Sequence, residues 1–424
     1  MGSLGGFFFR EAKGRYQVTR MKLKEGRINA DLQSGLTRRQ ILATAAGALC
    51  APVLRAAPAI GDAWRDLDLL CKKTLADQLA PGFSLSVMHA DQLLYSKGFG
   101  FANLETNTPV KPRSVFRIGS ITKQFTATAI LLLAEDGKLT VDDKLSRFLP
   151  DFPHADTITL KQMLTHTSGL GNYTQTDTPE MFMQAARTDY NDQALLTAMR
   201  NTNPLFASRP GTTWQYSNTA YVLLGLVIGK ASGVPYSRFF QERLLTPIGL
   251  SSTAVDDAAT VVPGRVSGYT PNSATPSGFD NASFISMSFP GAAGSIRSTT
   301  EDLCRWHQAL LGVRVLKPEF LTAMLTPVRL NNGSLPMEDA SSATHQPPTQ
   351  LEYGYGLALG TSAGRRWVGH HGSINGFISQ LRTFPAQKIS AAVLINSDLT
   401  SRPTLAVEMT ALRDEALRIA LKSA

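Results

Sequence analysis

The chain has little cysteine and no pattern of metal ligands. Only three of its 424 residues are cysteines, namely Cys50, Cys71 and Cys304. So few thiols cannot form a disulfide framework in a chain of this size, and none stands at the spacing of a zinc site. No His-Glu-x-x-His sequence occurs either. We therefore expect no metal and no cofactor, and we expect Cys71 and Cys304 to be packed thiols.

The main part of the chain also lacks an excess of charge. The formal net charge is +9, but ten of the 42 basic residues and three of the 33 acidic residues lie in residues 1–59. The remainder holds 32 basic against 30 acidic residues and is nearly neutral. A nearly neutral surface gives no electrostatic argument for binding a polyanion. We therefore expect no nucleic-acid partner.

The basic N-terminal segment lacks a hydrophobic run long enough to span a membrane. Arg38 and Arg39 precede an uncharged run at 41–54, and small residues follow at 56–59. This run has the length of a signal-peptide core, and a basic tail alone would not explain it. The segment resembles a twin-arginine export signal, which is a receptor-read address and not an anchor. We predict that residues 1–59 are this signal, that the mature protein is periplasmic or secreted, and that it has no stable membrane anchor.

Secondary-structure patterns are concentrated at the two ends of the remaining chain. We predict strands at 83–89, 93–100, 353–359, 366–369, 377–384 and 389–396. We predict helices at 121–135, 160–164, 194–199, 220–230, 237–245 and 405–421. Strands at both ends with helices between them indicate one sheet built from the two termini, with a helical middle. Residues 262–290 and 331–350 show no clear pattern.

Three short motifs, Ser120–Lys123, Tyr216–Asn218 and His370–Gly372, follow one another along the chain. Residues three apart share a face of a helix, with Cβ atoms about 5–6 Å apart. An amine at that distance can accept the proton of a serine hydroxyl, which makes the hydroxyl a nucleophile. A serine at a helix start is otherwise a common cap. The ordered set of motifs favours catalysis, with Ser120 as nucleophile and Lys123 as its base.

In this order, Ser-x-x-Lys, Tyr-x-Asn and His-x-Gly resemble the motifs of the penicillin-recognising serine hydrolases, in the branch of class C β-lactamases, soluble DD-carboxypeptidases and family VIII esterases. The segments 116–119, 164–170, 290–294 and 298–303 match as well, and the resemblance covers about residues 65–415. It implies an α/β (α+β) fold with a five-stranded antiparallel sheet flanked by helices. We place the hydrolase domain at 60–424, its sheet subdomain at 60–137 and 295–424, and its helical subdomain at 138–294.

The resemblance also implies roles for further residues. Tyr216 would relay protons to the leaving group, and His370 would occupy the position where the family has lysine or histidine. Both are therefore candidate catalytic residues beside Ser120 and Lys123. The candidate substrate-binding residues are Asn218, which would orient the substrate carbonyl or amide, and Gly372 and Ser373. Gly372 would let the substrate backbone approach, and the Ser373 N–H would be an oxyanion donor together with the Ser120 N–H.

We predict a serine hydrolase that forms an acyl-enzyme with a small molecule or short peptide, with a cell-wall D-amino-acid peptide or a β-lactam as the first candidates. One alternative is a binding protein that traps such compounds without turnover, and another is a short-chain carboxylesterase of the same fold. A third is an α/β-hydrolase using Ser362 of the Gly-x-Ser-x-Gly sequence at 360–364, which we interpret instead as a hairpin turn. We expect a monomer, and we expect His166 and His307 to be structural.

Overall fold

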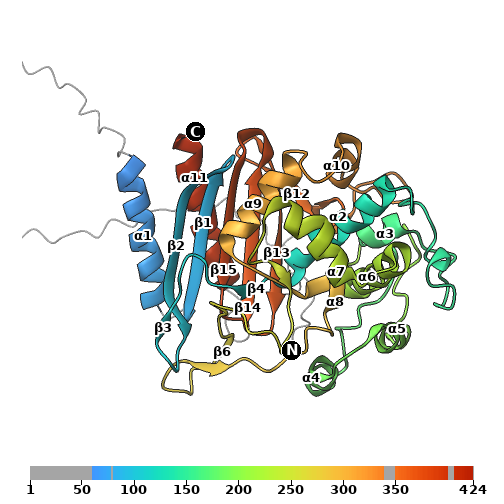
Figure 1. Ribbon diagram of the computed structural model, residues 1–424, viewed down its shortest axis with the longest axis horizontal. Helices are drawn as coiled ribbons and strands as arrows, with labels where there is room; N and C mark the ends of the chain where they lie inside the picture. The colour runs from blue at the N-terminus through green and yellow to red at the C-terminus, as the bar shows by residue number, and fades with distance from the viewer. Residues whose placement is uncertain (1–59, 78–79, 339–348, 400–404, 424) are drawn as a thin grey trace, which may run out of the picture. The chain divides into compact units, whose positions relative to one another are not determined.

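The computed structural model describes residues 60–77, 80–338, 349–399 and 405–423 (Figure 1). The predicted export signal at 1–59 lies outside the described residues. The helices are α1 (Ile60–Ala76), α2 (Thr122–Glu135), α3 (Leu160–Leu164), α4 (Pro179–Arg187), α5 (Asp192–Arg200), α6 (Asn218–Ser232), α7 (Tyr236–Phe240), α8 (Gly291–Gly294), α9 (Thr300–Leu311), α10 (Pro318–Met324) and α11 (Leu405–Ser423). Shorter helical turns are η1 (Gly119–Ile121), η2 (Leu145–Arg147), η3 (Gln241–Leu245), η4 (Thr246–Ile248) and η5 (Pro385–Gln387). None of these described helices is long and apolar enough to cross a membrane.

An antiparallel sheet joins the two ends of the described chain. Its strands are β1 (Gly82–His89), β2 (Gln92–Asn103), β3 (Thr108–Pro109), β11 (Glu352–Tyr353), β12 (Ala358–Ser362), β13 (Arg365–Ile374), β14 (Phe377–Phe384) and β15 (Ile389–Ile395). They lie in the order β11-β12-β13-β14-β15-β1-β2-β3. Phe83 at the start of β1 is opposite Ile395 at the end of β15, so the predicted sheet from both termini is confirmed. It has eight strands instead of the expected five, because the two-residue strands β3 and β11 extend its edges and the five-residue strand β12 adds one more next to β11.

Side-chain alternation along the central strands gives the sheet two buried faces. On β1, Phe83, Leu85 and Val87 belong to a core shared with α1 and α11. Met88 belongs to the other core, which extends through α9 and the helices of the middle of the chain. Figure 1 shows α9 and α11 alongside the central strands. Cys71 and Cys304 are buried as free thiols, one in each core, which confirms that they are packed and unpaired.

Helix α2 is buried between layers, as its apolar composition predicts. Twelve of its residues are buried, and it packs against α6 and α8. Gly137 follows its C-terminus with φ +70°, a conformation that glycine adopts without steric cost. The other described strands are β4 (Phe116–Arg117), β5 (Ala254–Val255), β6 (Tyr269–Pro271), β7 (Phe279–Asn281), β8 (Ile296–Ser298), β9 (Met337–Glu338) and β10 (Thr349–Gln350). The division into sheet and helical subdomains stays a prediction.

One predicted strand is wrong. Residues 353–359 form the end of β11, a turn and the start of β12. Gly356 in the turn has φ +67°, and a Cβ on Gly354 would lie 2.1 Å from the carbonyl oxygen of Met324. A close approach to α10 and a left-handed residue therefore interrupt a run that is hydrophobic enough for a strand. Part of the unassigned 262–290 segment forms the β6–β7 pair.

Candidate active site

Ser120 lies on η1, the short turn between β4 and α2. Gly119 before it has φ +48°, and a Cβ there would lie 3.0 Å from both N and O of Ser373. Only glycine combines this left-handed backbone with such a close approach to β13. Ser120 is half-buried, whereas Lys123 one turn further into α2 is fully buried. The turn therefore presents the hydroxyl toward solvent with the amine beneath it.

The amine of Lys123 contacts three uncharged oxygen atoms. Its Nζ lies 3.1 Å from Ser120 Oγ and 2.8 Å from Asn218 Oδ1. The third contact is the carbonyl oxygen of Ala293, at 2.9 Å. Burial lowers the pKa of Lys123 well below its usual value, and no carboxylate is among these partners to restore the charged form. The site therefore favours a neutral amine next to the serine hydroxyl.

Tyr216 lies in the loop before α6, as predicted, and is half-buried. The centre of its ring is 4.7 Å from Lys123 Nζ. Burial raises the pKa of the Tyr216 phenol above its usual value, and a hydrogen bond with Ser120 opposes this shift. Ser120, Lys123 and Tyr216 thus meet at one place although they are far apart in sequence, and the phenol is protonated at neutral pH.

The start of α6 positions Asn218. Ser217 is the N-cap residue, and its hydroxyl accepts a hydrogen bond from the Ala220 N–H. The Asn218 amide nitrogen donates to Thr174 Oγ1 at 3.2 Å, while its amide oxygen accepts from Lys123. These two contacts orient the amide, so Asn218 is both a neighbour of Lys123 and a half-buried group that substrate can reach.

The third motif lies on the part of β13 that extends beyond its pairing with β12. Pairing with β12 stops at Gly369, so residues 370–374 pair only with β14, and η1 packs against them. A Cβ on Gly372 would lie 2.1 Å from the Ile118 carbonyl oxygen and 2.9 Å from the Ser120 nitrogen. Gly372 thus has a role besides the expected approach of the substrate backbone. Because it has no side chain, η1 can pack closely against β13. Ser373 is exposed beside this contact.

His370 is held by hydrogen bonds at both ring nitrogens. Nδ1 donates to the His371 carbonyl oxygen at 2.5 Å, and Nε2 lies 3.1 Å from the hydroxyl of Tyr353. Burial lowers the pKa of His370 well below its usual value. The neutral ring therefore accepts from Tyr353 at Nε2, and its centre lies 6.4 Å from the ring centre of Tyr216. Tyr353 is a neighbour that the sequence patterns did not identify.

His166 was expected to be structural, and the structure gives it a position next to the site that the sequence did not indicate. It is fully buried, and its Nδ1 accepts a hydrogen bond from the Ser217 N–H at 3.1 Å. Its ring lies 4.4 Å from that of Tyr216, centre to centre. His166 therefore supports the loop that carries the second motif. The one sequence signal was its position in the matching segment 164–170.

The structure also shows the positions of His307, which we expected to be structural, and of Ser362, the alternative nucleophile. His307 on α9 is buried between Gln124 and Thr383. Ser362 ends β12 and pairs with Arg365 of β13 across a turn at Ala363 and Gly364, both of which have positive φ. The predicted hairpin at 360–364 is thus confirmed. A nucleophile elbow needs a helix after the serine, and β13 follows instead.

The chain is similar to known proteins over most of its length. The Beta-lactamase family model matches residues 67–412. A penicillin-binding protein of Bacillus subtilis is 29% identical over 334 residues, which are 74% of this chain and 68% of the relative. The D-amino acid amidase of Ochrobactrum anthropi is 25% identical with a TM-score of 0.72, covering 85% of this chain and 99% of that one. An octameric penicillin-binding protein homologue of Pyrococcus abyssi is 26% identical with a TM-score of 0.67, covering 82% and 77%.

Proposed function

The chain belongs to the beta-lactamase family and is a serine hydrolase, and we propose that Ser120 attacks a substrate carbonyl to form an acyl-enzyme that water then hydrolyses. The observation that carries the proposal is the contact of 3.1 Å between the hydroxyl of Ser120 and the buried amine of Lys123. A serine hydroxyl needs a nearby base to become a nucleophile at neutral pH.

The other two contacts of Lys123 determine which way its lone pair points. A neutral amine has two N–H donors and one lone pair. The oxygens of Asn218 and Ala293 are acceptors, so they take the two N–H groups. The lone pair then faces Ser120 Oγ, and Lys123 accepts the proton as the serine oxygen bonds to the carbonyl carbon.

Tyr216 would return this proton to the leaving group. Its hydroxyl is protonated and hydrogen-bonded to Ser120, so it can donate to a leaving nitrogen or oxygen while it receives the proton held by Lys123. The negative oxygen of the tetrahedral intermediate would be bound by the N–H groups of Ser120 and Ser373, whose segments are in contact. Each such donor contributes a few kcal/mol in the transition state. Asn218 would orient the substrate.

Two observations support an amide next to a D-amino acid as the substrate, as in a cell-wall peptide or a D-amino-acid amide. The solved structure that is similar over 85% of this chain is a D-amino acid amidase. In addition, His370 is neutral and accepts from Tyr353, so it offers no fixed positive charge for the free terminal carboxylate of a cell-wall peptide, and this favours the D-amino-acid amide of the two. A β-lactam is the second candidate, because the Bacillus subtilis relative is a penicillin-binding protein.

Intact-protein mass spectrometry after mixing with a penicillin tests the nucleophile, with wild type and Ser120→Ala compared. We expect a mass increase in wild type that is absent in the variant. An adduct that persists indicates a carboxypeptidase or a binding protein without turnover, and one that decays fast indicates a β-lactamase. An adduct of equal size in Ser120→Ala would overturn the assignment of Ser120.

Hydrolysis of matched small substrates tests the substrate class. We expect D-phenylalanine amide to be hydrolysed faster than L-phenylalanine amide and faster than a short-chain ester such as p-nitrophenyl butyrate. Ser362→Ala is the matched control, since that serine lies in a hairpin. Preference for the ester would favour the carboxylesterase alternative, and loss of activity in Ser362→Ala alone would contradict the proposed site.

We also propose that residues 1–59 direct export to the periplasm or the medium and that the mature protein is a monomer. The paired arginines and the uncharged run at 41–54 support export. The Pyrococcus abyssi homologue is octameric, so light scattering on the mature chain is the direct test of the monomer. Replacing Arg38 and Arg39 by Lys should retain the precursor in the cytoplasm, and export that is unaffected would contradict the signal.

A further inference from the structure

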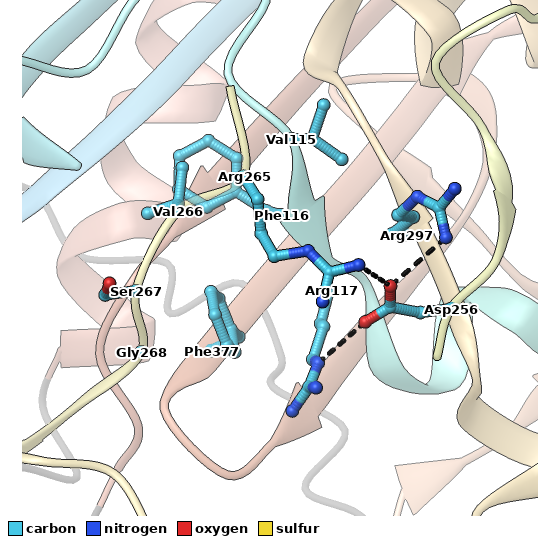
Figure 2. Close-up of a pocket in the computed structure, with 10 residues that line it drawn as sticks. All are labelled: Val115, Phe116, Arg117, Asp256, Arg265, Val266, Ser267, Gly268, Arg297 and Phe377. Carbon is cyan, nitrogen blue, oxygen red and sulfur yellow. Dashed lines mark hydrogen bonds and ion pairs between the residues drawn. The ribbon is translucent and has the colours of Figure 1, made fainter. Parts of the chain in front are cut away.

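A pocket lined by charged and apolar side chains lies beside β4, β5 and β8 (Figure 2). It has a volume of about 250 Å³, and Figure 2 shows the side chains of Arg117, Arg265 and Arg297 converging on Asp256. Val266 and Phe377 provide apolar surface on the other side. None of the proposed catalytic residues is in its lining as the structure describes it. We call it the arginine pocket.

The three arginines share one carboxylate. Arg117 Nε donates to Asp256 Oδ2 at 2.9 Å, and Arg265 Nη2 donates to Oδ1 at 2.9 Å. Arg297 Nη1 donates to the same Oδ1 at 3.2 Å. The Asp256 side chain is only 2% exposed, so both of its oxygens are occupied by these contacts and shielded from water. The carboxylate therefore fixes the three guanidinium groups around the pocket.

The cluster keeps a positive charge after this pairing. Three guanidinium groups against one carboxylate leave +2, and Asp257 is a further acid that interacts with the charge of Arg297. The carboxylate of Asp257 accepts hydrogen bonds from Thr260 and from the Ala259 N–H, although the charge of Arg297 reaches it. The arginine side chains are 14% to 31% exposed. Positive charge that is partly removed from water favours pairing with an anion.

The arginines also keep hydrogen-bond donors for such a partner. Arg117 uses Nε and Arg297 uses Nη1. Among the described residues, no acceptor contacts Nη1 or Nη2 of Arg117, or Nε or Nη2 of Arg297. The planar fork of a guanidinium group matches the oxygens of a carboxylate or phosphate. The pocket thus combines a charge surplus, unused donors and an apolar wall.

We propose that the arginine pocket binds a small organic anion through its carboxylate or phosphate group, with an apolar part of the ligand against Phe377 and Val266. The volume of about 250 Å³ lies below the roughly 300–1,000 Å³ of pockets for drug-sized ligands, so a small anion or the end of a larger molecule fits. This proposal is independent of the acyl-enzyme mechanism.

Isothermal titration calorimetry with inorganic phosphate and with benzoate, each at constant ionic strength, tests the proposal. We expect saturable binding of at least one probe to wild type. Arg297→Gln removes one cation and a charge-assisted hydrogen bond, so it should weaken binding by about tenfold or more. Asp256→Asn removes a negative charge, which raises the surplus positive charge of the pocket, and it should strengthen binding of the anion. Arg238→Gln is the control, because that arginine pairs with Glu242 at an exposed position.

The outcomes separate a ligand site from a structural ion cluster. Binding of benzoate but not phosphate identifies a carboxylate ligand with an apolar body, and the reverse identifies a phosphate; either supports the site. Absence of saturable binding of both probes to wild type would overturn it, as would equal binding by wild type and Arg297→Gln. If Asp256→Asn does not fold, the wild-type titrations and Arg297→Gln still decide.

Discussion

The cluster around Lys123 and the cluster in the arginine pocket place basic side chains in opposite surroundings. Among the described residues, the hydrogen-bond partners of Lys123 are the uncharged oxygens of Ser120, Asn218 and Ala293. Arg117, Arg265 and Arg297 instead share the carboxylate of Asp256. The first cluster favours a neutral amine, whereas the second holds permanent cations.

The comparison shows that the neighbours, and not the residue type alone, decide what a basic side chain does. A buried lysine without a counter-ion loses its proton and becomes a base. An arginine stays charged in any surroundings, so a carboxylate can fix its position without changing its state. A fold that needs both a proton acceptor and fixed charges can therefore separate them by placing its carboxylates.

Lys123→Arg is expected to have the largest effect. A guanidinium group stays protonated, so it cannot accept the proton of Ser120. We expect kcat to fall by about 10³-fold, within the range lost when a general base is removed. Circular dichroism checks that the variant is folded. Activity above a tenth of wild type would mean that Lys123 is not the base.

Asn218→Asp makes the lysine site resemble the arginine site, because it places a carboxylate 2.8 Å from Lys123 Nζ. The wild-type pKa of Lys123 is lowered by burial, so activity should fall as the pH drops through that lowered value. The new carboxylate favours the charged amine and raises this pKa. At neutral pH we expect about 10²-fold lower kcat/KM, and partial recovery as the pH is raised.

The control for that variant is Asn218→Ala, which removes the same amide without adding charge. Its pH profile should keep the acid limb of wild type. If Asn218→Asp and Asn218→Ala show the same acid limb in their pH profiles of kcat/KM, the charge state of Lys123 does not control the reaction. The difference between the two clusters would then not affect catalysis.

Asp256→Asn makes the reverse change, since it removes the carboxylate from among the three arginines. The guanidinium groups would then repel one another in partly buried positions. We expect the free energy of unfolding to fall by about 2 kcal/mol, less than for a fully buried pair. Urea denaturation measures this difference. An unchanged midpoint would show that the carboxylate does not stabilise the cluster.

His166→Phe should have the smallest effect, because it acts on Tyr216 through the backbone. The substitution leaves the buried Ser217 N–H without its acceptor. We expect kcat to fall about tenfold with a smaller change in KM, together with a loss of roughly 1–3 kcal/mol in stability. His89→Phe, at the half-buried end of β1, is the control. Equal kinetics for the two variants would leave His166 with a purely structural role.

Patterns of short range predicted much of the fold. The helix of α2, the strand of β14 and the β1–β2 hairpin lie where periodicity and turn residues indicated. The single strand expected at 353–359 was wrong because its hydrophobic run did not reveal the approach of Gly354 to Met324. The short edge strands were not foreseen, since two-residue pairings have no pattern of their own.

The sequence by itself determined the order of the three motifs, the spacing that brings Ser120 and Lys123 to one face of a helix, and the burial of that helix. The tertiary structure decided the chemistry of their surroundings. The acceptors of Lys123 lie 95 and 170 residues away along the chain, and Asp256 meets Arg117 across 139 residues. A protonation state depends on neighbouring charges as well as on burial, and the sequence does not show which residues long-range packing brings next to the amine.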